Sequence, residues 1–231
     1  MRFRFSDEQE MFRRTVRAFA DRELTPDYLR ELDAEARAPH WELLPKMAEV
    51  GFTALPVPPD YGGMGGSVVD TTILLEEIGR SSLSVASMLN FAIGFGCETV
   101  KRFGSEEQKQ DLLPKIVSGE MCFAFSLTEP DAGSDAAAIR TRAVADGDEY
   151  VINGTKIFTT GAAEARCLVV ATRTDTALIE RAISSARPIT RDDLVPGAGS
   201  SSYNVTTGPL RTLTISPLTP KSCSTVSNIR A

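Results

Sequence analysis

Histidine is nearly absent from this chain of 231 residues, since His40 is the only one. Most zinc sites, His-based triads and His general-base schemes need imidazole beside defined partners, so the composition excludes most of them. We interpret His40, next to Trp41, as a structural residue at a helix start. Cysteines are few, far apart and without a C-x-x-C pair, so we expect reduced, mostly buried thiols and no metal site. They are Cys97, Cys122, Cys167 and Cys223.

Long apolar runs and unbalanced positive charge are also missing. No apolar run approaches the ~18 to 20 residues of a membrane-spanning helix, and the opening "MRFRFSDEQE" lacks an apolar signal-peptide core. The net charge is -6, with 25 basic residues interleaved among 31 acidic ones. Nucleic acids and anionic membranes attract clustered Lys and Arg, so we expect neither as a partner. These absences predict a cytoplasmic protein.

Helical patterns fill the first half of the chain. Ser6 and Gln9 have the spacing of a capping box, as do Ser105 and Gln108 before "DLLPKIVSGE". Apolar residues recur at helical spacing after the first box at Phe12, Val16, Phe19 and Ala20. We therefore expect an all-helical domain over residues 1–120.

Two further helices in this domain flank a glycine-rich loop. One is predicted from His40 to Val50, closed by Gly51, and the other over "VVDTTILLEEIGR". The intervening "YGGMGGS" fits no nucleotide-binding template, because the dinucleotide pattern would need glycine at Val68 and no G-K-[ST] follows. A structural loop or a pocket rim is favoured over a phosphate site.

The periodicity changes to that of strands after Met121. Asp146-Gly147 and Asn153-Gly154 separate short alternating runs, and both dipeptides favour tight hairpin turns. They predict a three-stranded antiparallel meander, followed by a fourth strand over 165–175. Helices first and strands second indicate an α+β chain without a Rossmann domain.

The composition changes again near Thr176. Ser, Thr and Pro supply 22 of the residues in 176–231, and Tyr203 is the only aromatic residue there. Such a segment has little with which to build a core, so we expect a low-order tail.

The stretch "FSLTEPDAGSD", residues 125–135, leaves a strand and turns at once. Pro130 restricts Glu129 to extended backbone, Gly133 permits left-handed or close-packed backbone, and Ser134 and Asp135 suit turns or caps. The hydroxyls and backbone N–H groups of such a turn suit a polar ring edge or a phosphate. An ordinary strand exit uses the same residue types, so the residues alone leave both readings open.

Four motifs over residues 1–175 come in the order found in one family. They are "FSDEQEMFRRTVRAFA", "PPDYGGMGGS", "RFGSEEQKQDLLPKIVSGE" and "TEPDAGSD" followed by "YVINGTKIFTTGA". This order resembles the acyl-CoA dehydrogenase family. The resemblance implies an N-terminal helical domain over 1–120, part of a middle β domain carrying the flavin and acyl-CoA site over 121–175, and a tail over 176–231 without family resemblance.

The resemblance implies a flavoprotein oxidoreductase of fatty acid metabolism. Family members bind FAD and convert an acyl-CoA thioester to the 2-enoyl-CoA. The implied flavin contacts are Phe125, Leu127, Thr128, Phe158, Thr159 and Thr160. Gly133 and Ser134 are the implied acyl-CoA contacts, and Phe158 stands where the family often has Trp. Glu129 and Asp135 are interpreted as turn or cap residues and not as catalytic carboxylates.

The chain also departs from the family pattern. The family's third domain carries the catalytic glutamate and much of the oligomer interface, and it is not found here, so the base that takes the α proton is unassigned. A reading-frame change near Thr176 is our hypothesis for the altered tail. Three functions stay open. The first is an acyl-CoA dehydrogenase that is inactive or impaired as this chain, with electron-transfer flavoprotein or a similar acceptor if active. The second is an acyl-CoA oxidase or flavin monooxygenase relative completed by another chain, and the third is a non-catalytic remnant or partner-binding helical fragment.

Overall fold

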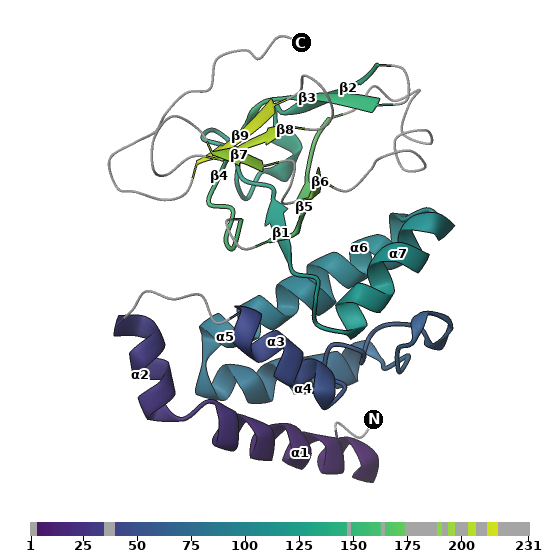
Figure 1. Cartoon of the computed structure of the whole chain (residues 1–231), viewed down its shortest axis with the longest axis vertical. Helices are drawn as coiled ribbons and strands as arrows, with labels where there is room; N and C mark the ends of the chain where they lie inside the picture. The colour runs from purple at the N-terminus through teal and green to yellow at the C-terminus, as the bar shows by residue number, and fades with distance from the viewer. Residues whose placement is uncertain are drawn as a thin grey trace. The chain divides into compact units, whose positions relative to one another are not determined.

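The computed structural model describes residues 4–34, 40–146, 149–162 and 165–173 and four short strands beyond them (Figure 1). The chain divides into two compact units, Met1–Glu98 with Gln110–Glu120 and Thr99–Lys109 with Met121–Ala231. Helices precede strands along the chain, which confirms the α+β class.

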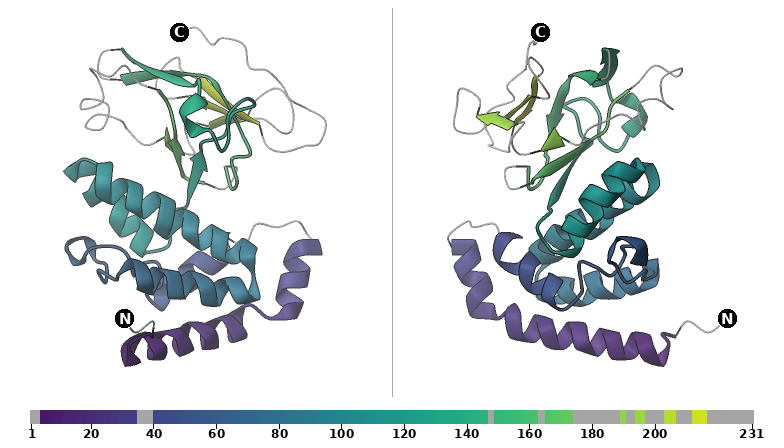
Figure 2. Two further views of the ribbon diagram at one scale, coloured as in Figure 1. Left: turned by 180° about the vertical axis from the view of Figure 1, so that it is seen from behind. Right: turned by 45° about the vertical axis from the view of Figure 1, so that its right-hand side comes forward.

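Seven α-helices make up the described part of the first 120 residues. They are α1 (Asp7–Glu23), α2 (Pro26–Ala34), α3 (His40–Glu49), α4 (Val68–Ser81), α5 (Leu83–Asn90), α6 (Cys97–Phe103) and α7 (Glu106–Val117), with a 3₁₀ turn η1 (Pro59–Tyr61) and a π-helical turn η2 (Phe91–Gly96). In Figure 2, α1 runs along α4, against which it packs. Fully buried apolar side chains from α1, α3, α4 and α5, Val16, Leu44, Leu74 and Leu89 among them, form the core of this unit.

Both predicted capping boxes are confirmed. The Ser6 hydroxyl accepts from Gln9 N at 3.1 Å, and Gln9 Oε1 accepts from Ser6 N at 3.1 Å. Ser105 and Gln108 make the same reciprocal pair at 3.2 and 2.9 Å before α7. The predicted helix starting at His40 is observed, and Gly51, with φ +80°, follows its last turn.

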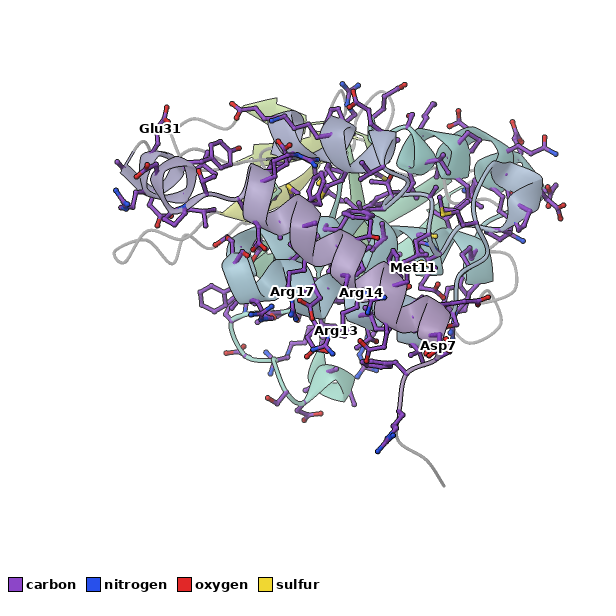
Figure 3. The ribbon with its side chains drawn as sticks, turned by 90° about the horizontal axis from the view of Figure 1, so that it is seen from below. Asp7, Met11, Arg13, Arg14, Arg17 and Glu31 are labelled. Carbon is purple, nitrogen blue, oxygen red and sulfur yellow. The ribbon has the colours of Figure 1, made fainter. Side chains whose placement is uncertain are left out.

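A buried carboxylate joins α1 to α4, which the sequence analysis missed. Glu77 of α4 is 2% exposed and accepts hydrogen bonds from three arginines at 2.7 to 3.0 Å. Two of these arginines, Arg13 and Arg17, extend from α1, as Figure 3 shows. The third, Arg80, belongs to α4. The bond from Arg17 is the largest cause that lowers the pKa of Glu77 to about 2; burial opposes it, and Arg13 and Arg80 add to it.

The glycine-rich loop before α4 is held by its own backbone. Met64 N donates to Ala54 O at 2.9 Å, Gly65 N donates to Val57 O at 2.8 Å, and a Cβ on Gly63 would lie 1.9 Å from the Val57 carbonyl oxygen. These N–H groups are already bonded within the protein, which favours the structural loop or pocket rim over a phosphate site.

One uninterrupted helical stretch, Leu83–Phe103, combines α5, η2 and α6. Its 21 residues contain an 18-residue window of mean hydropathy 1.3, so it is long and apolar enough to cross a membrane. The expectation that no apolar run approaches the length of a membrane-spanning helix is therefore wrong by helix length and mean hydropathy. Half of the window is buried inside the protein, as in the core helix of a soluble protein, and Ile93 is fully buried. The cytoplasmic location stays a prediction.

Nine strands are described in the second unit: β1 (Phe123–Ser126), β2 (Arg142–Asp146), β3 (Glu149–Asn153), β4 (Thr155–Ile157), β5 (Cys167–Val170), β6 (Ile189–Thr190), β7 (Leu194–Pro196), β8 (Tyr203–Thr206) and β9 (Thr212–Ser216). Their sheet orders are β1-β5-β6, β2-β3 and β4-β9-β8-β7. Most pairs are antiparallel, but β1 pairs with β5 and β4 with β9 in parallel. A small core of Ala124, Ala162, Ala165 and Leu168 lies under β1 and β5.

The predicted three-stranded meander is wrong at its second turn. β2 and β3 form the expected antiparallel hairpin, in which Asp146 pairs with Glu149, although Gly147 lies outside the described residues. β4 does not pair with β3, because Gly154 lacks the positive φ that a type I′ turn requires. Gly154 instead packs so tightly on Thr141 that a Cβ would lie 2.2 Å from its Oγ1.

The predicted low-order tail contains β6 to β9, while its other residues lie outside the described part of the chain. Cys97, Cys122 and Cys167 are buried thiols outside any disulfide, as predicted, and Cys223 lies outside the described residues.

Candidate functional site

The first segment of the candidate site is the exit from β1. β1 pairs in parallel with β5 from Phe123 to Ser126, so the chain leaves the sheet at Leu127. Glu129 and Ala132 then exchange backbone hydrogen bonds at 2.8 and 3.2 Å and close a tight turn around Pro130. Leu127 and Thr128 therefore lie, half-buried, between a fixed strand and a fixed turn.

The second segment of the candidate site is the exit from β4. Phe158 has φ +58° and is the one non-glycine residue with positive φ among those described. This sparsely populated backbone turns the chain, so that the Phe158 side chain is 53% exposed while Thr159 is 8% exposed. Gly161, at φ +72°, completes the turn, and Thr160 between them is exposed.

These two exits lie side by side. Ile157 N donates to Thr128 O at 2.9 Å, and the hydroxyls of Ser126 and Thr159 are 2.8 Å apart. The structure thus brings Leu127 and Thr128, predicted from one motif, against Phe158, Thr159 and Thr160, predicted from another. The Thr159 hydroxyl bonds Ser126 and so faces inward.

A buried ion pair lies beneath the junction. Lys156, of β4, is 0% exposed, and its Nζ donates to Leu127 O and to Glu129 Oε1, both at 2.9 Å. Glu129 also accepts from the Thr141 amide at 2.9 Å, the Thr141 hydroxyl at 2.6 Å and the Arg140 amide at 2.6 Å. Burial acts to raise the pKa of Glu129, but the bonds from Thr141, Arg140 and Lys156 outweigh it and lower the pKa to about 2.

These bonds decide what Glu129 can do. Its carboxylate is fully engaged and is a very weak base, so it does not suit the removal of a proton from a substrate. Asp135 precedes the 3₁₀ turn Ala136–Ala138, but its side chain makes no capping bond. Among the described residues, no group of three or more His, Cys, Asp or Glu side chains is arranged to hold a metal ion.

Thr128 keeps its polar groups available. Its carbonyl is used by Ile157, whereas none of the described residues bonds its N–H or hydroxyl. Gly133 is exposed, and a Cβ there would contact only Thr128 Cγ2, at 3.9 Å. Gly133 has neither a positive φ nor a close neighbour, so the fold itself does not require glycine there. Ser134 is exposed beside it.

The assignment of flavin and acyl-CoA contacts to these residues stays a prediction. Phe125 is half-buried within β1, and the remaining predicted residues gather at the two exits described above. Sequence reasoning missed Lys156, Thr141 and Ser126, because their partners are 27, 12 and 33 residues away and no local spacing connects them.

Comparison with known proteins decides the family. The sequence model of the acyl-CoA dehydrogenase N-terminal domain matches residues 6–120, and that of the acyl-CoA dehydrogenase middle domain matches residues 124–212. The chain belongs to the acyl-CoA dehydrogenase family. The middle-domain match continues past Thr176, where the composition changes, and the boundary at residue 175 and the reading-frame change stay predictions.

Individual members of the acyl-CoA dehydrogenase family match over most of this chain. A probable acyl-CoA dehydrogenase, YngJ, of Bacillus subtilis is 39% identical over 170 residues, 74% of this chain and 44% of that protein. The caffeyl-CoA reductase-Etf complex subunit CarC of Acetobacterium woodii is 37% identical over 181 residues, 78% of this chain and 48% of that protein. The glutaryl-CoA dehydrogenase complex with glutaryl-CoA is similar in structure, with TM-score 0.75, 32% identity and coverage of 89% of this chain and 51% of that one. The chain therefore spans about half the length of these relatives.

Proposed function

We propose that this chain carries the flavin-binding face of an FAD-dependent acyl-CoA dehydrogenase. The observation that supports this best is the junction of the two strand exits. It joins Thr128, whose N–H and hydroxyl bond none of the described residues, by a backbone hydrogen bond to Ile157, the neighbour of the exposed Phe158. A flavin needs hydrogen-bond donors at its polar edge and an apolar cover for its ring. The family's reliance on flavin supports the same conclusion.

Each residue at the junction would make a different contact with the flavin. The Thr128 amide and hydroxyl would donate to the polar edge of the ring, and Phe158 and Leu127 would cover its apolar part. Thr160, exposed at the turn, would bond the opposite end, while the inward-facing Thr159 would hold the turn through Ser126. Bound FAD would supply acceptance of a hydride from the substrate's β-carbon.

The acyl-CoA would enter past Gly133 and Ser134. The missing side chain at Gly133 leaves room that no described protein atom fills, and Ser134 adds an exposed hydroxyl. The Glu129 carboxylate is engaged and does not suit the role of base, and we propose that a group outside the described residues takes the proton on the α-carbon. We therefore propose that these 231 residues alone are impaired in turnover and function in fatty acid metabolism only when that group is supplied.

The partner proposal rests on the relatives. CarC is named as a subunit of a complex with Etf, which supports electron-transfer flavoprotein as the redox partner here. The same relative is named a reductase, so reduction of a 2-enoyl-CoA is the second candidate direction. Homo-oligomerisation and cytoplasmic location stay predictions.

A titration with FAD tests this function. The purified chain is titrated with FAD while flavin fluorescence is followed, beside Thr128→Val and the matched control Thr72→Val, which alters an exposed threonine of α4. We expect binding to the parent chain and the control, and about tenfold weaker binding to Thr128→Val, as for a lost ring-edge hydrogen bond. Absence of binding to the parent chain would refute the proposed site.

A further inference from the structure

The Lys156–Glu129 ion pair holds the two chain neighbours of Thr128, the residue on which the proposed function depends. Leu127 and Glu129 flank Thr128 in the chain, and one ammonium group bonds both of them at 2.9 Å. The next residue after Lys156 donates its amide to the Thr128 carbonyl at 2.9 Å. Thr128 is thus held on both sides by two consecutive residues of β4.

The donors around Glu129 show that this pair is fixed in one geometry. Its Oε1 accepts from Lys156 and from the amide and hydroxyl of Thr141, and its Oε2 accepts from the Arg140 amide. Arg140 and Thr141 lead into β2. The carboxylate therefore ties the start of β2, the turn after β1 and the middle of β4 to one point.

Stability alone does not account for such a pair. Burying two charges costs desolvation energy, and a well-packed apolar pair often stabilises a core as well or better. An apolar side chain at position 156 would not bond the Leu127 carbonyl. What the ammonium adds is a fixed position for the backbone of residues 127–129.

We propose that Lys156 and Glu129 are positioning residues for flavin binding, which set the register of residues 127–129 against β4 and so aim the N–H and hydroxyl of Thr128. Without the ammonium, the Leu127 carbonyl and the Glu129 carboxylate would lose their bonds to β4, and the Ile157–Thr128 bond would lose that support. This inference rests on the proposed function, but the register itself can be measured without flavin.

Four variants separate positioning from stability. Lys156→Met and Glu129→Gln each leave one buried partner unpaired and are expected to lower the melting temperature. The double variant Glu129→Gln/Lys156→Met leaves no charge buried alone, so it should regain most of the lost melting temperature. Lys115→Met, which alters an exposed lysine paired with Asp111, is the matched control.

The first readout is the exchange rate of the Ile157 amide, measured by NMR, because this amide bonds Thr128 O. In the double variant we expect exchange at least about tenfold faster than in the parent chain, whereas amides of α4 are unchanged. The second readout is the dissociation constant of FAD, expected to be at least about tenfold weaker in the same variant.

A double variant with the parent chain's Ile157 exchange and FAD affinity would overturn the proposal and leave the pair a role in stability only. If the parent chain binds no FAD, the proposed function fails, and the Ile157 exchange alone decides the role of the pair.

If the double variant does not fold, Thr141→Val replaces it, because valine keeps the shape of threonine and removes only the hydroxyl donated to Glu129 at 2.6 Å. Faster Ile157 exchange at an unchanged melting temperature then supports positioning, and unchanged exchange refutes it.

Discussion

At the residue scale, two carboxylates lie buried, each with three or more donors, and neither is placed as a base. Glu77 binds three arginines between α1 and α4, and Glu129 binds Lys156, Thr141 and a backbone amide in the β unit. Both pKa values are lowered to about 2. The ionised forms are therefore part of the fold, and their protonation should weaken it.

The pH dependence of Glu77 follows from the sign of its shift. Because its folded pKa lies below the unfolded value of 4.5, its contribution is complete above about pH 4.5 and is lost as the pH falls towards 2. A shift of this size corresponds to about 3 kcal/mol. We predict that Glu77→Gln lowers the free energy of unfolding by about 3 kcal/mol at pH 7.

Urea titrations at pH 7 and pH 3 measure this effect. Glu77→Gln should also lose less stability between the two pH values than the parent chain does. The control Glu76→Gln changes the exposed neighbour on α4 and should behave as the parent chain at both pH values. Equal pH dependence in all three proteins would contradict the role given to Glu77.

At the scale of helices and strands, the sequence predicted the features that depend on residues close together in the chain. The Ser6–Gln9 capping box spans four consecutive residues, so the residue spacing alone predicts its hydrogen bonds. The predicted start of α1 is therefore correct. The predicted hairpin turn at Asn153-Gly154 is wrong. Gly154 packs on Thr141, and β4 pairs with β9 and not with β3. Long-range pairs such as Lys156 with Glu129 leave no local signature at all.

Two glycines in the β unit make this distinction testable. Gly154→Ala would place Cβ 2.2 Å from Thr141 Oγ1 and 2.6 Å from its Cα, whereas Gly133→Ala would meet only Thr128 Cγ2 at an ordinary 3.9 Å. We predict a loss of about 1 to 3 kcal/mol for Gly154→Ala, as for an overpacked core. Gly133→Ala should keep its stability in thermal unfolding but weaken acyl-CoA binding. The two glycines would be misassigned if Gly133→Ala were the less stable protein.

At the scale of the whole molecule, the chain contains the helical domain that the family model matches over residues 6–120 and, in its β unit, the proposed flavin-binding face. The family was predictable from four motifs, and both family-domain matches support it. The side-by-side position of the two motifs predicted to contact flavin was not predictable from spacing, since it depends on how β1 and β4 end against each other. The 231 residues span about half the length of their relatives, so the catalytic base is not assigned.

The most direct test is the absorption spectrum of the purified chain with FAD, recorded without oxygen before and after an acyl-CoA is added. We predict a bound-flavin spectrum that shifts when the acyl-CoA meets the Gly133–Ser134 turn but does not bleach, because the Glu129 carboxylate is engaged and the proposed base lies outside the described residues. Bleaching would contradict the proposal that the base lies outside the described residues. No flavin absorbance co-eluting with the protein, even after FAD is added, would contradict the central claim that this face binds the cofactor.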